Sequence, residues 1–304
     1  MAISRHQLVK ELEPGLNALF GLEYKRYDNQ HAEIYTSESS DRAFEEEVML
    51  SGFGNASVKS EGSGVAFDNA QESYSARYTH ETVALAFAIT EEAIEDNLYD
   101  KISSRYTKAL ARSMSNAKQV KAAAPLNNGL PSVDGFDSGD GVSLFNTSHT
   151  TVSGTNVKNT LTTQADLNET SLEQAMIDIA AMTDERGLRI AAKAVKMIVP
   201  SANQFQAERL MKSQGRVGTA DNDINALGSM GMIPQGYRVN NYLTDTDSFY
   251  IITDVPNGMK MFTRAPLTTA MEGDFDTGNV RYKARERYSF GVSDFRGIFA
   301  SEGA

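Results

Sequence analysis

Apolar residues recur every three or four positions between residues 90 and 123, which is the spacing of one buried face on an α-helix. Thr90 supplies an N-cap oxygen, and acidic residues precede basic ones along the segment, as the helix dipole favours. The pattern predicts a helix over 90–123 that ends at Pro125 and is about 50 Å long. Its predicted core face consists of Ile94, Leu98, Ile102, Tyr106, Leu110, Met114, Ala117 and Val120.

The segment before this helix has the pattern of a long β-hairpin over residues 43–88. Residues 44–50 resemble a strand, and the Gly/Ser-rich stretch 51–64 is typical of a flexible tip. The return strand alternates in two opposite phases, so we expect it to change layers between Thr79 and Thr82. The first phase is carried by Tyr74, Ala76 and Tyr78, and the second by Val83, Leu85, Phe87 and Ile89.

Downstream of the long helix, strands alternate with helices and predict a compact α/β module over 171–264. A second amphipathic helix is expected over 171–186, a buried strand over 194–200, and a helix over 201–211 with a Glu208–Lys212 ion pair. From residue 265 onward the pattern returns to long alternating segments, 278–291 and 292–300, which predict a β ribbon beside the long helix. At the other end of the chain, residues 3–20 predict a short helix interrupted at Pro14 and Gly15.

Composition excludes several classes of protein. The 304 residues include no Cys, so disulfides, thiolate catalysis and Cys-bound zinc are excluded. The formal charge of −11 disfavours a protein that grips nucleic acid through its phosphates. We find neither a membrane-spanning apolar run nor a signal peptide, so we expect a soluble, unexported protein.

Candidate chemistry is sparse, and we expect no catalytic site, no metal site and no cofactor. The four isolated histidines (His6, His31, His80 and His149) are expected at the surface or in the hairpin. Asp134, Asp137 and Asp140 offer oxygen ligands to calcium, but their spacing favours a simple turn.

Four segments, in this order, resemble the major capsid proteins of tailed bacteriophages with the Hong Kong 97-type fold, and most of all Mu-like major head subunits. They are residues 90–98 (TEEAIEDNL), 144–149 (LFNTSH), 194–201 (AVKMIVPS) and 287–298 (RYSFGVSDFRGI).

The resemblance implies an α+β fold in four parts. These are an N-terminal arm (1–42), an extended β-hairpin loop (43–88), a peripheral domain of spine helix and β ribbon (89–170 and 265–304), and an α/β axial domain (171–264). It also implies a shell of hexamers and pentamers with icosahedral symmetry around double-stranded DNA, located in the virion after assembly in the host cytoplasm. Implied partners are further copies of the chain, a separate scaffolding protein, a portal and decoration proteins, but no membrane.

Two rival functions stay open at this point. Encapsulin-type shells share the fold but enclose protein cargo, and a soluble enzyme with a lid hairpin would place its site near Ser201 or Asp254. The absence of a catalytic cluster argues against the enzyme.

The hairpin carries the residues that we expect at contacts between subunits, namely Phe53, Lys59, Tyr74 and Tyr78. A hairpin of this length is unstable alone and gains stability by lying on a neighbour. For Lys59 two interpretations remain: a solvated surface charge, or, by the resemblance, one partner of an isopeptide cross-link whose Asn and Glu we cannot locate.

Overall fold

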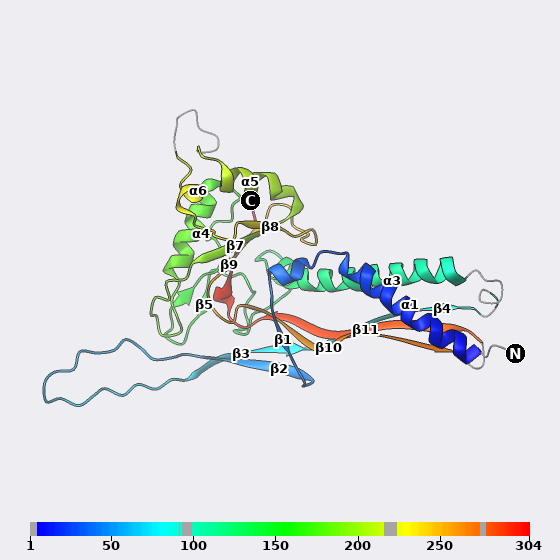
Figure 1. The fold of residues 1–304 in the computed structure, drawn as a ribbon. Coiled ribbons are helices and arrows are strands. Elements are labelled where there is room, and N and C mark those ends of the chain that lie inside the picture. Colours follow the sequence, from blue (N-terminus) through cyan, green and yellow to red (C-terminus); the bar gives the residue numbers. More distant parts are fainter. Residues whose placement is uncertain (1–4, 91, 93–98, 216–223, 274–277) are drawn as a thin grey trace.

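The structure, a computed structural model, describes residues 5–90, 92, 99–215, 224–273 and 278–304. The molecule is elongated (Figure 1). An α/β unit forms one end, a long sheet beneath two helices forms the other end, and a hairpin projects past the α/β unit. No helix in the described part of the chain is both long and apolar enough to cross a membrane.

The helical elements are α1 (Arg5–Lys25), η1 (Gln30–Glu33), α3 (Tyr99–Asn128), α4 (Glu169–Ala181), η2 (Ser201–Asn203), α5 (Gln204–Lys212), α6 (Ala226–Met230) and η3 (Phe295–Gly297). The strands are β1 (Thr36–Ser39), β2 (Phe44–Leu50), β3 (Glu72–Thr79), β4 (Glu81–Ile89), β5 (His149–Thr150), β6 (Asn156–Val157), β7 (Ala194–Val199), β8 (Tyr237–Val239), β9 (Phe249–Thr253), β10 (Met259–Gly273), β11 (Val280–Val292) and β12 (Ile298–Ser301).

The long sheet, called here the elongated sheet, has the strand order β1-β10-β11-β4. Strands β10 and β11 form an antiparallel ribbon, and β1 joins the edge in parallel. The predicted strand over 278–291 is confirmed as β11, but its predicted partner over 292–300 was wrong, because β11 pairs with β10. Helices α1 and α3 cover one face of this sheet (Figure 1). Their apolar side chains meet the inward residues of β11, and the buried cluster consists of Leu16, Phe20, Leu110, Ala111, Met114, Tyr282 and Ala284.

Helix α3 corresponds to the predicted long helix, but its C-terminal end lies further along the chain than predicted. It runs through Pro125 to Asn128, although a proline removes one helical hydrogen bond. Beyond the proline, burial of Leu126 in the main core stabilises the last turn, and in the turn before it the Tyr35 hydroxyl donates to the Ala122 carbonyl. The predicted stop at Pro125 was therefore wrong.

The predicted core face of this helix is only partly described. Ile94 and Leu98 lie outside the described residues, and Ile102 lies outside the described side chains. Leu110 and Met114 are buried, but Tyr106 is 52% exposed at the rim, where its ring contacts Phe87. Tyr106 and the half-exposed Val120 were wrongly placed in the core, because the buried face is narrower than the apolar pattern.

The chain changes layers between Thr79 and Glu81, as predicted. Strand β3 pairs with β2 in a separate two-stranded sheet, whereas β4 pairs with β11. The hairpin thus consists of β2, the loop 51–71 and β3, and we call it the projecting hairpin. The predicted hairpin over 43–88 was too long, because the apolar side of β4 packs beneath the helices of the elongated sheet, where Phe87 contacts Tyr282.

The α/β unit contains the second four-stranded sheet, with the order β12-β9-β7-β8, and helices α4, α5 and α6. The predicted strand over 194–200 and the apolar face of α4 are confirmed, and the main core of the molecule lies here. Strand β12 pairs with β9. The C-terminal residues 298–301 therefore belong to this unit, whereas the sequence placed them with the ribbon.

The N-terminal part also differs from the prediction. Helix α1 continues through Pro14 and Gly15 without interruption. Further along the arm, Ile34 and Tyr35 are buried in the main core, and β1 is a strand of the elongated sheet. Residues 30–39 are thus part of the folded body and do not form a free arm.

Candidate assembly surface

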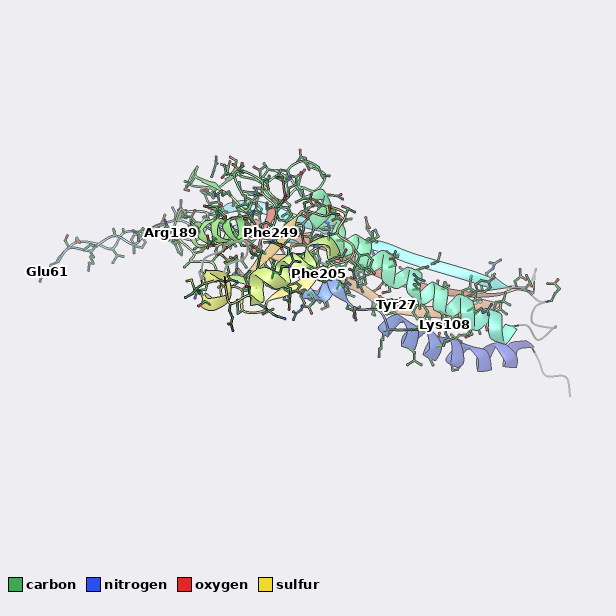
Figure 2. The ribbon with its side chains drawn as sticks, turned by 90° about the horizontal axis from the view of Figure 1, so that it is seen from above. Tyr27, Glu61, Lys108, Arg189, Phe205 and Phe249 are labelled. Carbon is green, nitrogen blue, oxygen red and sulfur yellow. The ribbon has the colours of Figure 1, made fainter. Side chains whose placement is uncertain are left out.

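The loop of the projecting hairpin exposes large apolar side chains to solvent. Val58 is 97% and Phe67 98% exposed, and Phe53 and Val65 are more than 60% exposed. Figure 2 shows Glu61 at the far end of this loop, well away from the rest of the molecule. Exposed apolar groups gathered on one projecting element are typical of an interaction site. The predicted contact residue Phe53 is thus available to a partner.

The base of the projecting hairpin adds a second exposed apolar group that the sequence analysis missed. Phe44, Val48 and Leu50 are 38%, 48% and 63% exposed. They share the exposed face of β2 with Glu46, since all four lie at every second position of the strand.

Tyr74 and Tyr78, predicted to lie between subunits, instead pack within the chain. Tyr78 is 2% exposed, its ring meets Phe262 edge-on at 4.8 Å, and its hydroxyl hydrogen-bonds to the Ser293 hydroxyl. Tyr74 is half-buried, and its ring lies tilted against that of Phe295 with 6.5 Å between the centroids. Tyr78 thus attaches the hairpin base to β10 of the elongated sheet, and Tyr74 attaches it to η3.

A buried ion network reinforces this attachment. The Lys260 ammonium lies 2.5 Å from Glu47 of β2 and 3.1 Å from Glu38 of β1. Burial alone would lower the pKa of Lys260, but hydrogen bonds to the two carboxylates raise it above its usual value. The hairpin base is thereby held by charge as well as by packing.

A second network joins the hairpin to the α/β unit. Arg296 is 3% exposed and pairs with Glu185 at 2.6 Å and with Asp294 at 3.2 Å. Burial raises the pKa of Asp294 despite the neighbouring guanidinium. Glu185 also accepts a hydrogen bond from Ser73 of β3, so the hairpin is connected to the buried pair.

Three of the four histidines do not lie at the surface, contrary to the sequence prediction, and the side chain of His6 lies outside the described side chains. His31, His80 and His149 are all less than 9% exposed. His149 stacks on Phe295 with 3.8 Å between ring centroids and contacts the Asp140 carboxylate at 2.6 Å. The Asp140 carboxylate is therefore engaged in a hydrogen bond with His149 inside the chain. Within the described residues, no three His, Cys, Asp or Glu side chains are arranged to hold a metal ion.

Lys59 lies exposed on the hairpin loop. Its exposure fits a solvated charge, and the cross-link stays a prediction. The rival enzyme positions are ordinary parts of the α/β unit: Ser201 begins η2, and the Asp254 carboxylate accepts a hydrogen bond from the Lys193 backbone.

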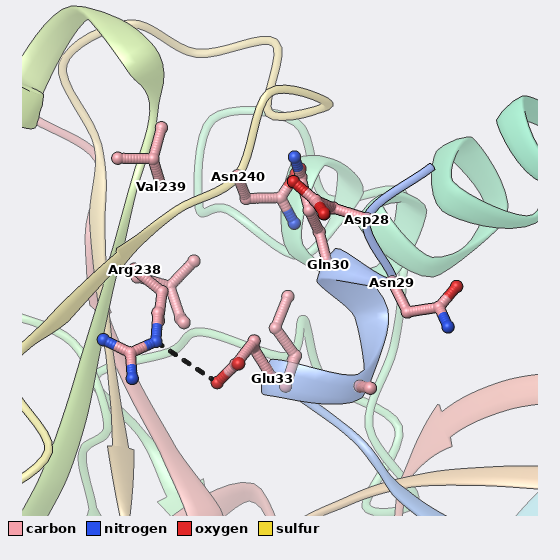
Figure 3. A pocket seen from close by; sticks show the side chains of 10 residues that line it. Asp28, Asn29, Gln30, Glu33, Arg238, Val239 and Asn240 are labelled. Atoms are coloured by element: carbon pink, nitrogen blue, oxygen red, sulfur yellow. Dashed lines mark ion pairs between the residues drawn. The ribbon is translucent and has the colours of Figure 1, made fainter. Parts of the chain in front are cut away.

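One pocket of about 450 Å³ lies between η1 and β8 (Figure 3). Glu33 projects into it and lies 3.5 Å from the Arg238 guanidinium and 2.6 Å from Lys196. Its hydrogen bond with Lys196 holds the pKa of Glu33 below its usual value. These two ion pairs fasten the N-terminal segment to the α/β unit, because Lys196 and Arg238 belong to β7 and β8 of that unit.

The long helix over a β ribbon, the separate α/β unit and the projecting hairpin are the parts that the resemblance to capsid proteins with the Hong Kong 97-type fold implies. A family model described as "Phage capsid protein" matches residues 73–301. The chain belongs to this family of phage capsid proteins, which are structural components of the virion.

Solved structures with similar folds include capsids and related particles. The capsid protein of Myoviridae phage XM1 is 13% identical with a TM-score of 0.54, and 89% of each chain is covered. The procapsid protein of bacteriophage JBD30 is 14% identical with a TM-score of 0.54, covering 99% of this chain and 77% of that chain. The virus-like particle from Pyrococcus furiosus is 10% identical with a TM-score of 0.53, covering 95% and 98%. No curated protein matches the sequence.

Proposed function

We propose that this chain is a major head subunit that assembles as hexamers and pentamers into an icosahedral shell around double-stranded DNA. The observation that carries the proposal is the projecting hairpin, whose most exposed apolar residues, Val58 and Phe67, have no partner within the described chain. Burying such side chains on a neighbouring copy removes apolar surface from water, at about 25 cal/mol per Å². The hairpin loop then acts as the contact element between subunits.

The charge of the chain suits an inner wall that faces packaged DNA. A formal charge of −11 opposes adhesion of phosphates, so the DNA remains mobile inside the shell. In this proposal a separate scaffolding protein, a portal and decoration proteins complete the particle, assembly takes place in the host cytoplasm, and the subunit is of the Mu-like type.

An encapsulin-type shell is the second candidate, since the fold is also similar to that of a virus-like particle. Purified particles separate the two candidates by their contents. Nuclease-resistant double-stranded DNA in particles from infected cells supports the head subunit, and protein cargo without DNA supports the nanocompartment.

The role of the hairpin is tested by replacing Val58, Val65 and Phe67 together with Ser. All three side chains project from the loop 51–71 and are more than two-thirds exposed, so we expect the subunit to fold normally and shell formation to be lost. Ile177→Ser with Phe205→Ser is the matched control, because these side chains are 62% and 68% exposed on the α/β unit. Sedimentation of assembled particles is the measurement. Normal shells from the loop variant would show that the hairpin loop is not needed for contacts between subunits.

A further inference from the structure

A row of basic side chains lies on the open face of the elongated sheet. It consists of Arg281, Lys283, Arg285 and Arg287, at every second position of β11. Successive strand residues point to opposite faces, and the residues between them are buried beneath α1 and α3. Figure 1 places both helices on one face of the sheet, so the row points away from them.

The residues beside the row, on the neighbouring strands β4 and β10, are mostly small and uncharged. On β4, the residues paired with the row are Ala88, Ala86, Ala84 and Thr82, in order from Arg281 to Arg287. On β10 they are Glu272, Ala270, Thr268 and Ala265. The longer basic side chains therefore stand above a shallow strip, at intervals of about 7 Å over a length of about 20 Å.

Three members of the row have no internal counter-ion. Lys283, Arg285 and Arg287 form no ion pair with any residue in the described part of the chain, whereas buried cations such as Lys260 and Arg296 are paired. The Arg287 Nε atom is buried without a hydrogen-bond partner among the described groups. Like charges this close repel one another, so an external anionic surface would relieve the repulsion.

We propose that this basic row is the docking site for an acidic surface of a second copy of the same chain. The inference rests on the proposed shell function and identifies an electrostatic contact within it. Charge complementarity carries the argument: each copy has a net charge of −11, and the row is a concentrated patch of the opposite sign. Such complementarity fixes the register between partners and speeds their encounter.

Duplex DNA fits the row less well than a second copy does. The row is one residue wide, the residues paired with it on β4 and β10 include no further cation, and Glu272 lies beside Arg281. A protein that binds DNA through phosphates needs a broader basic surface, and the net negative charge of this chain repels the polyanion.

The test is charge reversal in the row. Lys283→Glu with Arg285→Glu should lower the self-associated fraction about tenfold at low salt, and addition of NaCl should weaken association of the wild type but not of the variant. The control is Lys108→Glu with Lys193→Glu, which changes the net charge equally at exposed positions on α3 and on the α/β unit (Figure 2 labels Lys108). Lys283→Arg with Arg285→Lys should retain association. Analytical ultracentrifugation measures the fraction, and circular dichroism checks folding.

The outcomes separate this inference from the shell function. Equal association of the reversal and control variants overturns the inference and leaves the shell function intact. Association that depends on the row but yields no closed particles supports the inference and removes the shell function. A wild type that never self-associates overturns both. Gel shifts with a duplex DNA fragment test whether the row binds DNA instead. If Lys283→Glu with Arg285→Glu abolishes DNA binding and leaves self-association unchanged, the row is a nucleic-acid site and the inference is overturned.

Discussion

The Arg186 guanidinium donates a hydrogen bond of 3.0 Å to Oδ1 of Asp68, and this ion pair joins the projecting hairpin to the α/β unit. The same guanidinium reaches the Asn69 carbonyl at 2.7 Å, and the second Asp68 oxygen accepts from the Gly54 backbone. These contacts cross the loop and fasten one side of it. The position of the loop 51–71, beyond the firmly held hairpin base, therefore depends on a few polar contacts near the surface.

Loss of this contact should loosen the loop without unfolding the protein. In Arg186→Ala we expect faster proteolytic cleavage within residues 51–71 and an unchanged melting temperature, because exposed ion pairs contribute little to global stability. Limited proteolysis with mass spectrometry measures the cleavage rate. The control is Lys212→Ala, which removes the exposed pair with Glu208 on α5. Identical cleavage in the two variants contradicts the role given to Arg186.

The buried face of α3 should be far more sensitive than its rim. Leu110→Ala is expected to cost about 2–5 kcal/mol, because Leu110 is 3% exposed beneath the elongated sheet. Val120→Ala should cost less than about 1 kcal/mol, since Val120 is half-exposed on the same helix. Urea denaturation of the unassembled subunit gives both values. Equal costs would mean that the buried face is wrongly assigned.

Removal of Arg296 should destabilise the α/β unit strongly. Arg296→Ala leaves the carboxyl groups of Glu185 and Asp294 buried without their cation, and a broken buried pair of this kind costs about 3–5 kcal/mol. Thermal denaturation checks the prediction. A melting temperature close to that of the wild type would show that solvent reaches the cluster.

Stability should fall as the pH is lowered from about 6.5 toward 4 because of His31. Burial lowers the pKa of His31 to about 4, and the Lys118 charge acts in the same direction. Between the two pKa values the unfolded chain binds a proton that the folded chain does not, so up to about 3 kcal/mol of stability is lost over this interval. The lowered pKa of His80 acts in the same direction, whereas the raised pKa values of Glu286 and Asp294 oppose it.

The variant His31→Gln isolates this contribution. Its free energy of unfolding should change less steeply with pH in this interval than that of the wild type, whatever its absolute stability. Urea denaturation of the unassembled subunit at several pH values gives the two slopes. Equal slopes would rule out His31 as the group responsible.

Local patterns were sufficient to predict the elements whose burial is periodic. Nearby residues alone predicted the strand Ala194–Val199 and the apolar face of α4. They also predicted the Glu208–Lys212 ion pair, at 2.7 Å, and the change of layers at His80. The separation into a long helix, a ribbon and an α/β module could be recognised for the same reason.

Properties set by distant residues could not be predicted. Tyr78 is buried by Phe262 and Ser293, which lie about two hundred positions further along the chain, so its alternation alone could not distinguish an internal contact from an external one. The helix passes Pro125 and buries Leu126 in the main core, among residues far from it in the sequence. Likewise, strand β12 leaves the ribbon because β9 offers it a free edge in the α/β unit.

The most direct test of the account is negative-stain electron microscopy of the purified recombinant protein, alone and with its scaffolding protein. The account predicts closed shells, or rings of five and six subunits, for the wild type, and their loss when Val58, Val65 and Phe67 are replaced by Ser. A monodisperse monomer under every condition, at concentrations where the subunit is folded, would contradict it.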